Sequence, residues 1–187
     1  MPRRRLSERA ALGAVLLLTA AGCDDAPEAV APPDDYRLLE HQVAAVGVPD
    51  DWDDGDDETL LEADPDAVVA EHPDAEELHV GASLWRYSEP VSTAEEAVSV
   101  MAGQLSVAPG HEQHERRSLE VAGSDDAFLI QLSIEAPALD GQTVFFTYAG
   151  AMYDNEHAVL MRLVGPEDLI TEQMVEVALE TLRVDGG

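Results

Sequence analysis

The chain has 187 residues, with 39 Asp or Glu against 10 Arg and no Lys, which gives a formal net charge of −29 at pH 7. A protein with so large a negative charge repels nucleic acid and anionic lipid headgroups, because the binding of both depends on Lys and Arg side chains that neutralise phosphates. We therefore exclude nucleic acid as a partner and expect the charge to favour basic partners and cations.

The first 23 residues have the pattern of a bacterial export signal. Arg3, Arg4 and Arg5 precede an uncharged run at residues 10–21, which is too short to span a bilayer as a helix. Residues 19–23 (TAAGC) resemble a lipobox, in which the cysteine is acylated and becomes the new N-terminus. Cys23 is the only cysteine, so we expect a lipid anchor on the extracytoplasmic face of the cell membrane. An ordinary secretory signal is the alternative, and Sec and Tat export both remain open.

The remaining chain divides into a tether and one domain. Without residues 1–22 it has 187 − 22 = 165 residues, with six Arg and 38 Asp or Glu, hence a charge of 6 − 38 = −32. Residues 23–35 are acidic and rich in Pro, which is typical of an extended tether. Residues 36–187 are long enough for a single domain with one sizeable core.

The first part of the domain is strongly acidic. Residues 36–48 predict a strand or hairpin, which ends because Pro49 cannot donate to a ladder. Trp52 follows a Pro-x-x turn and is expected to be buried. Residues 50–77 hold fourteen carboxylates and no Arg, so we expect a surface segment with one helical turn near residues 67–70.

The middle of the domain predicts a strand followed by a helix. Residues 78–87 alternate with a period of two, which indicates a half-buried strand with the Leu78, Val80, Ala82 and Leu84 face toward the core. A helix is predicted over about residues 93–107, because Ser92/Glu95 or Thr93/Glu96 forms a capping box and Pro109 and Gly110 end it. Residues 111–115 are expected to form a loop before a strand that includes residues 117–121.

The last part predicts a strand meander closed by a helix. Strands are expected at residues 128–135, 143–153 and 157–164, separated by turns at residues 140–141 and 154–155. The final helix is expected to open at residues 165–168, with an apolar stripe that extends to Ala178. Strands and helices segregate along the chain, which favours an α+β fold with an antiparallel sheet covered by helices.

Four segments in this order resemble the PsbP-like fold and, within it, the LpqN-type lipoproteins of actinobacteria. They are the strand that runs into residues 49–52 (PDDW), the strand and helix at 78–105, LEVAG at 119–123, and the closing ALETLRV at 178–184. The resemblance implies an α/β/α sandwich around a central twisted antiparallel sheet. It carries no catalytic motif and implies a binding or assembly role. The acidic insertion at 53–77 and the Ala-rich first strand depart from the family pattern.

Two clusters are candidates for metal binding. His111 and His114 lie close together with the carboxylate of Glu112 between them, although the order is not that of an HExxH zinc site. The stretch DDWDDGDDE at residues 50–58 offers oxygen ligands suited to Ca²⁺, although no EF-hand register fits it. Its candidate ligands are Asp53, Asp54, Asp56 and Asp57. For both clusters the alternative is a solvated polar surface.

Three classes of function remain. The chain lacks the serine, cysteine and glycine-rich motifs of nucleophilic or phosphate-transfer enzymes, so we expect a non-catalytic protein without a cofactor. The first class is a scaffold that binds an envelope protein, and the second is a carrier of a lipid or small apolar ligand in a pocket between sheet and helix. A divalent-metal protein is the third. Four aromatic side chains could line a ligand groove or belong to the core, namely Trp52, Trp85, Tyr87 and Tyr153.

Overall fold

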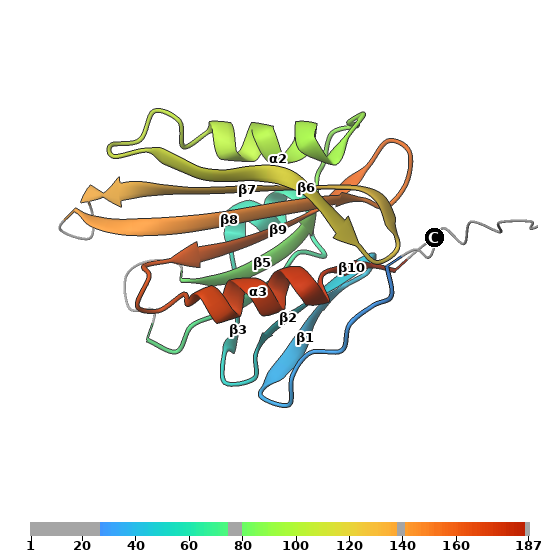
Figure 1. Cartoon of the computed structure of the whole chain (residues 1–187), viewed down its shortest axis with the longest axis horizontal. Helices are drawn as coiled ribbons and strands as arrows, with labels where there is room; N and C mark the ends of the chain where they lie inside the picture. Colours follow the sequence, from blue (N-terminus) through green and yellow to red (C-terminus); the bar gives the residue numbers. More distant parts are fainter. Residues whose placement is uncertain (1–26, 75–79, 138–140, 186–187) are drawn as a thin grey trace, which may run out of the picture.

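The computed structural model describes residues 27–74, 80–137 and 141–185, in which two β-sheets and three helices form (Figure 1). The larger sheet has the order β3 (Asp53–Gly55), β4 (Val68–Glu71), β5 (Gly81–Arg86), β9 (Ala158–Gly165), β8 (Gln142–Met152), β7 (Ser124–Ala136) and β6 (Glu112–Val121). The smaller sheet has the order β1 (Tyr36–His41), β2 (Ala44–Pro49) and β10 (Arg183–Val184). The helices are α1 (Glu58–Ala63), α2 (Ala94–Gly103) and α3 (Glu172–Thr181).

Both faces of the seven-stranded sheet are covered (Figure 1). Helix α2 packs against β7 and β8 on one face, and α3 with the smaller sheet lies on the other. One buried cluster, which includes Leu84, Leu129 and Met161, fills the space toward the smaller sheet. A second, which includes Val98 and Leu160, fills the space under α2. The predicted α+β class, with helices on both sides of a central antiparallel sheet, is confirmed.

The cap of α2 follows the Thr93/Glu96 alternative. Thr93 Oγ1 accepts a hydrogen bond from the Glu96 N–H at 3.2 Å, and the Glu96 carboxylate accepts one from the Ser92 N–H at 2.9 Å. These bonds satisfy two N–H groups that have no partner within the helix. The helix ends at Gly103, earlier than predicted.

The last helix starts later than predicted. Gly165 still belongs to β9, and the Pro166 carbonyl accepts hydrogen bonds from Leu169 and Ile170 in a separate turn. Helix α3 begins only after Thr171, whose hydroxyl caps the Met174 N–H at 3.3 Å. The expected helix start at residues 165–168 is therefore wrong.

The acidic segment contains a strand where we expected a helical turn. Residues 67–70 were expected to be helical, but Val68–Glu71 form β4, which pairs with both β3 and β5. The helix of this segment is α1, where the Asp57 carboxylate caps the N–H groups of Thr59 and Leu60.

Strands β5 and β6 also differ from expectation. Strand β5 is buried on both faces, because Leu84 packs in one cluster and Trp85 in the other. Leu78 lies outside the described residues. The expected loop at residues 111–115 is wrong, because β6 begins at Glu112 and pairs with β7, with an irregularity between Gln113 and Glu115.

Other expectations are confirmed. Residues 36–49 form the β1–β2 hairpin, and alternate residues of β7, from Phe128 to Leu132, face the cluster under α2. Trp52 is 3% exposed and packs in the first cluster, where its ring makes a T-shaped contact with the His72 ring.

Helix α3 lies close to the smaller sheet because Gly47 in β2 has no side chain. The Thr181 hydroxyl accepts a hydrogen bond from the Gly47 N–H at 2.7 Å and donates one to the Val177 carbonyl at 2.6 Å. A Cβ at Gly47 would lie 2.7 Å from that hydroxyl oxygen.

The predicted export signal and lipid anchor lie outside the described residues. Residues 1–22 and Cys23 are not among the described residues, and residues 27–33 form neither helix nor strand. Within the described ranges, no helix has the length and apolar character needed to cross a membrane.

Candidate functional site

A groove lies between β8 and the β9–α3 connection. It consists of two adjoining hollows of about 450 and about 290 Å³, which share Phe145 and Glu167. We call it the Phe145 groove. Its main lining residues are His114, Gln131, Gln142, Thr143, Phe145, Thr147, Leu163, Pro166, Glu167, Asp168, Ile170, Glu172 and Val175.

The floor of the groove consists of side chains that the strand pairing places on the same face of the sheet. Thr147 in β8 pairs with Gln131 in β7 and with Leu163 in β9, so these three side chains form one row across three strands. Phe145 lies two residues away on the same face of β8. The floor therefore combines an aromatic ring and an aliphatic side chain with two polar groups.

The polar side chains in the groove form hydrogen bonds with neighbouring side chains. His114 Nε2 lies 2.8 Å from Ser133 Oγ, and its ring packs against Phe145 with 5.7 Å between centroids. The Gln131 amide donates to Thr147 Oγ1 at 3.3 Å. The imidazole is 35% exposed, so it reaches solvent and can also contact a ligand.

The His114 and Ser133 pair superficially resembles a hydrolytic dyad. Glu112 is 4.0 Å from the other imidazole nitrogen and is 73% exposed, so it does not orient the ring firmly. Ser133 is 4% exposed and lies inside β7, between its neighbours β6 and β8. A substrate carbonyl has no access to this hydroxyl, and the pair does not support acyl transfer.

The two candidate metal clusters are not assembled into sites. His111 is exposed before β6, whereas His114 lies in the groove on Ser133. Of the acidic candidates, Asp53 and Asp54 lie in β3, Asp56 is exposed, and Asp57 caps α1. Asp54 binds Arg37 at 2.8 Å and Asp57 binds Arg162 at 3.0 Å. Among the residues that the structure describes, no three His, Cys, Asp or Glu side chains are gathered as metal ligands.

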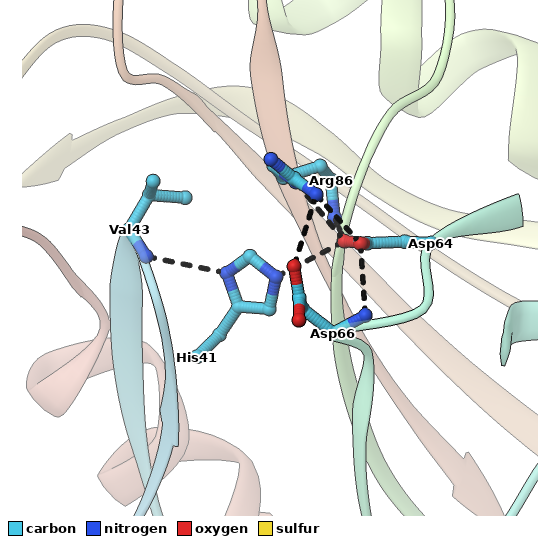
Figure 2. A network of polar contacts seen from close by, with 5 residues as sticks. All are labelled: His41, Val43, Asp64, Asp66 and Arg86. Atoms are coloured by element: carbon cyan, nitrogen blue, oxygen red, sulfur yellow. Dashed lines mark hydrogen bonds and ion pairs between the residues drawn. The ribbon is translucent and has the colours of Figure 1, made fainter.

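A buried polar network joins three distant segments (Figure 2). Asp64, which follows α1, is 2% exposed, and one carboxylate oxygen accepts from His41 Nε2 at 3.0 Å and from the Arg86 backbone N–H at 2.7 Å. The other oxygen accepts from Arg86 Nη2 at 3.0 Å and from the Asp66 N–H at 3.1 Å. The network ties the end of β1 to the end of β5 through one carboxylate.

The tautomer of His41 follows from these bonds. The Val43 N–H donates to His41 Nδ1 at 3.3 Å, so that nitrogen carries no proton and Nε2 donates to Asp64 (Figure 2). The imidazole is completely buried. No substrate can reach it, and we interpret this His–Asp pair as a structural tie.

The network sets the charge of Asp64. Burial alone would raise the pKa of this carboxyl, but the hydrogen bonds from the Arg86 side chain and backbone and from the Asp66 N–H lower it to about 2. Asp64 is therefore ionised at neutral pH although its side chain is buried.

The four aromatic candidates separate into two groups. Trp52 and Trp85 belong to the core, each 3% exposed. Tyr87 and Tyr153 line a shallow hollow of about 290 Å³ beside Arg86 and His157. Burial, followed by nearby carboxylates, raises the pKa of both tyrosines, so both remain neutral phenols at physiological pH.

Sequence reasoning did not find the Phe145 groove or the Asp64 network. Each is assembled from segments that are distant along the chain, and the bond between His41 and Asp64 spans 23 residues. The only local signal was composition: a lone Arg86 at the end of a strand after a purely acidic segment indicates a buried or paired carboxylate nearby.

Comparisons with known proteins support the fold. No protein-family model matches the chain, and no match is found among curated proteins. LpqN of Mycobacterium tuberculosis, a protein involved in cell envelope biogenesis, is similar with a TM-score of 0.51 at 12% identity, over 80% of this chain and 90% of LpqN. The Ran-binding protein Mog1p of Saccharomyces cerevisiae has a TM-score of 0.50 at 16% identity, over 81% of this chain and 96% of Mog1p. The chain thus has the predicted PsbP-like fold, which these two proteins share.

Proposed function

We propose that the chain is a lipoprotein, anchored through acylated Cys23 on the extracytoplasmic face of the cell membrane, whose domain binds an envelope protein and catalyses no reaction. The anchor rests on the basic, apolar and TAAGC pattern of residues 1–23. Two acyl chains on Cys23 supply the two signals that stable membrane attachment needs.

The Phe145 groove carries the binding part of the proposal. It is an open, elongated hollow with an aromatic floor, polar groups that are already held in place and an acidic edge at Glu167 and Glu172. Such mixed lining suits recognition of another molecule. The His114–Ser133 and His41–Asp64 pairs are unsuited to chemistry, because Ser133 and His41 are inaccessible.

Similar structures add support at the level of the fold. LpqN belongs to cell envelope biogenesis and Mog1p binds Ran, so this fold serves envelope and protein-binding roles in other proteins. Membership of the LpqN-type lipoproteins is part of our proposal.

A carrier of a small apolar ligand is the second candidate. The groove volumes of about 290 and about 450 Å³ fall near the lower end of small-molecule sites, about 300 to 1,000 Å³. A lipid carrier is less favoured, because buried side chains fill the space between the large sheet and the smaller sheet with α3.

The test is made in the native host with the full chain. Labelled palmitate should enter the wild-type protein and not Cys23→Ser, and only the wild type should sediment with membranes. A photo-crosslinking residue is placed in turn at Ser118, Glu172 and Glu180, which are all exposed. At least one position should capture an envelope protein, and positions that crosslink should capture the same one. A soluble wild-type protein, or the absence of crosslinks from all three positions, would contradict the proposal.

A further inference from the structure

We propose that the Phe145 groove receives an extended, basic segment of the partner protein, with an apolar side chain of that segment placed on the Phe145 ring. This inference rests on the proposed function and names the chemistry of the partner at that site.

The shape of the groove favours an extended chain. The two hollows join at Phe145 and Glu167, so the groove continues from Gln142 at the start of β8 to Val175 in α3. An extended peptide advances about 3.3 Å per residue with side chains on alternate sides. One side chain can therefore face the floor while its neighbours face the edges.

The floor favours an apolar or cationic side chain. Phe145 presents apolar surface next to the buried Leu163, and Ile170 and Val175 close the opposite side. An aromatic face also attracts a Lys or Arg cation, as in the contact between the Arg116 guanidinium and Phe128, 5.4 Å apart, elsewhere in this protein.

The edge favours positive charge. Glu167, Asp168 and Glu172 are exposed along one side, and Glu112 lies beside His114 on the other. The positive end of the α3 dipole offsets part of the Glu172 charge, and Glu167 and Asp168 lie before the helix begins. No Arg is among the lining residues.

A second copy of this chain is a poor occupant. Outside residues 1–22 the chain has six Arg and no Lys, and every one of these Arg lies in an ion pair with a carboxylate of the same chain. These residues are Arg37, Arg86, Arg116, Arg117, Arg162 and Arg183. Anionic lipid is equally unsuited to an acidic edge. The positive charge therefore has to come from a different protein.

The test uses the mature lipoprotein in nanodiscs of neutral phosphatidylcholine and two fluorescent eight-residue peptides. One alternates Lys with Leu, and the other replaces each Lys by Glu. We expect the Lys peptide to bind, the Glu peptide not to bind, and the affinity for the Lys peptide to fall as NaCl rises from 50 to 300 mM, since exposed charge pairs are screened by salt. Empty nanodiscs give the background.

Two double variants locate the binding. Glu167→Gln with Glu172→Gln removes two groove charges, and Glu176→Gln with Glu180→Gln removes two exposed charges from α3 outside the groove. Loss of two exposed ion pairs between the protein and the Lys peptide corresponds to a decrease of about five- to tenfold in affinity. We expect this decrease for the groove variant only. All four substitutions are isosteric and at exposed positions, and equal melting temperatures verify the fold.

Equal weakening by both double variants would show attraction to the acidic surface as a whole and would overturn the groove assignment. The groove assignment would also be overturned if the wild type and both double variants bound the Lys peptide with equal affinity, or if the Lys peptide did not bind at millimolar concentration. If these results occur while Ser118 or Glu180 still crosslinks an envelope protein, the groove assignment fails and the proposed function stands. Loss of every crosslink would instead contradict the proposed function.

Discussion

Replacing Asp64 by Asn should destabilise the domain strongly at neutral pH and weakly in acid. The substitution keeps the size of a 2% exposed side chain but removes the charge that faces Arg86 and His41. Breaking a buried ion pair from one side typically costs about 3 to 5 kcal/mol. Because the Arg86 side chain is 36% exposed and can regain water, we expect about 2 to 4 kcal/mol at pH 7.

The pH dependence follows from the pKa of Asp64. The folded protein holds this pKa at about 2, below the ordinary value of 3.8. A lowered pKa means that the ionised form stabilises the fold above pH 3.8 and that this contribution disappears as the pH falls toward 2. The difference of nearly two pKa units corresponds to about 2.5 kcal/mol at pH 7 and to about 0.8 kcal/mol at pH 2.5.

Urea unfolding of wild type and variant at pH 7 and pH 2.5 measures both quantities. Trp52 and Trp85 are buried, so their fluorescence reports unfolding, and 0.5 M NaCl screens repulsion among the surface carboxylates. Asp66→Asn is the control, because Asp66 also contacts Arg86 but is 40% exposed and should cost under about 1 kcal/mol. A cost of Asp64→Asn that stays the same at both pH values would refute the reasoning.

Substitutions at three further positions test the packing, one turn and one helix cap by the same unfolding assay. Trp52→Ala should cost about 3 to 5 kcal/mol because the ring is buried, and an unfolding midpoint close to wild type would contradict that placement. Gly123→Ala should cost more than about 1 kcal/mol, since Gly123 has a φ of +80° and an added Cβ would meet the Val184 carbonyl; an unchanged midpoint would show that this turn relaxes freely. Thr93→Ala should cost about 1 kcal/mol through the lost cap of α2, whereas Thr93→Ser, which keeps the hydroxyl, should remain near wild type.

The sequence predicted those elements whose local pattern agrees with their final environment. Phe128, Ile130 and Leu132 alternate because one face of β7 packs under α2, and the period of two is visible without the structure. The Thr93 and Glu96 spacing likewise describes bonds that form within a few residues. In both cases the information needed is local.

The misassigned elements depend on partners that are distant in sequence. Val68–Glu71 is a strand because β3 and β5 offer ladders on both sides, although the surrounding acids indicate only surface. Residues 112–115 are polar and read as a loop, yet β7 is thirteen residues long and pairs with them. The alternation in residues 78–87 predicts a half-buried strand, yet β5 is buried on both faces, with Leu84 in one cluster and Trp85 in the other, because one strand does not reveal that both sides of its sheet are covered.

The candidate site could not be predicted from the sequence, because its residues are also distant along the chain. The Phe145 groove draws its floor from β6, β7, β8 and β9, and its opposite side from α3 and the turn before it. The metal candidates, by contrast, were suggested by neighbours in sequence such as Asp53 and Asp57, which the fold separates between a strand and a helix cap. Proximity along an acidic segment is therefore a poor guide to a shared site.

The distribution of arginine connects the stability of this domain to the partner recognition that we propose. Arg37 joins β1 to β3, Arg86 joins β5 to the loop after α1, Arg116 joins β6 to α2, and Arg162 joins β9 to the cap of α1. Arg183 likewise pairs with Glu40, and Arg117 pairs with Glu115 inside β6. Because the six arginines outside residues 1–22 are all paired within the chain, they leave an excess of 38 − 6 = 32 carboxylates unbalanced. Long-range attraction to a basic partner is then a property of the whole surface, whereas selection of that partner requires a shaped site such as the Phe145 groove. Salt should accordingly slow association with any basic protein, but only groove substitutions should change which partner is retained.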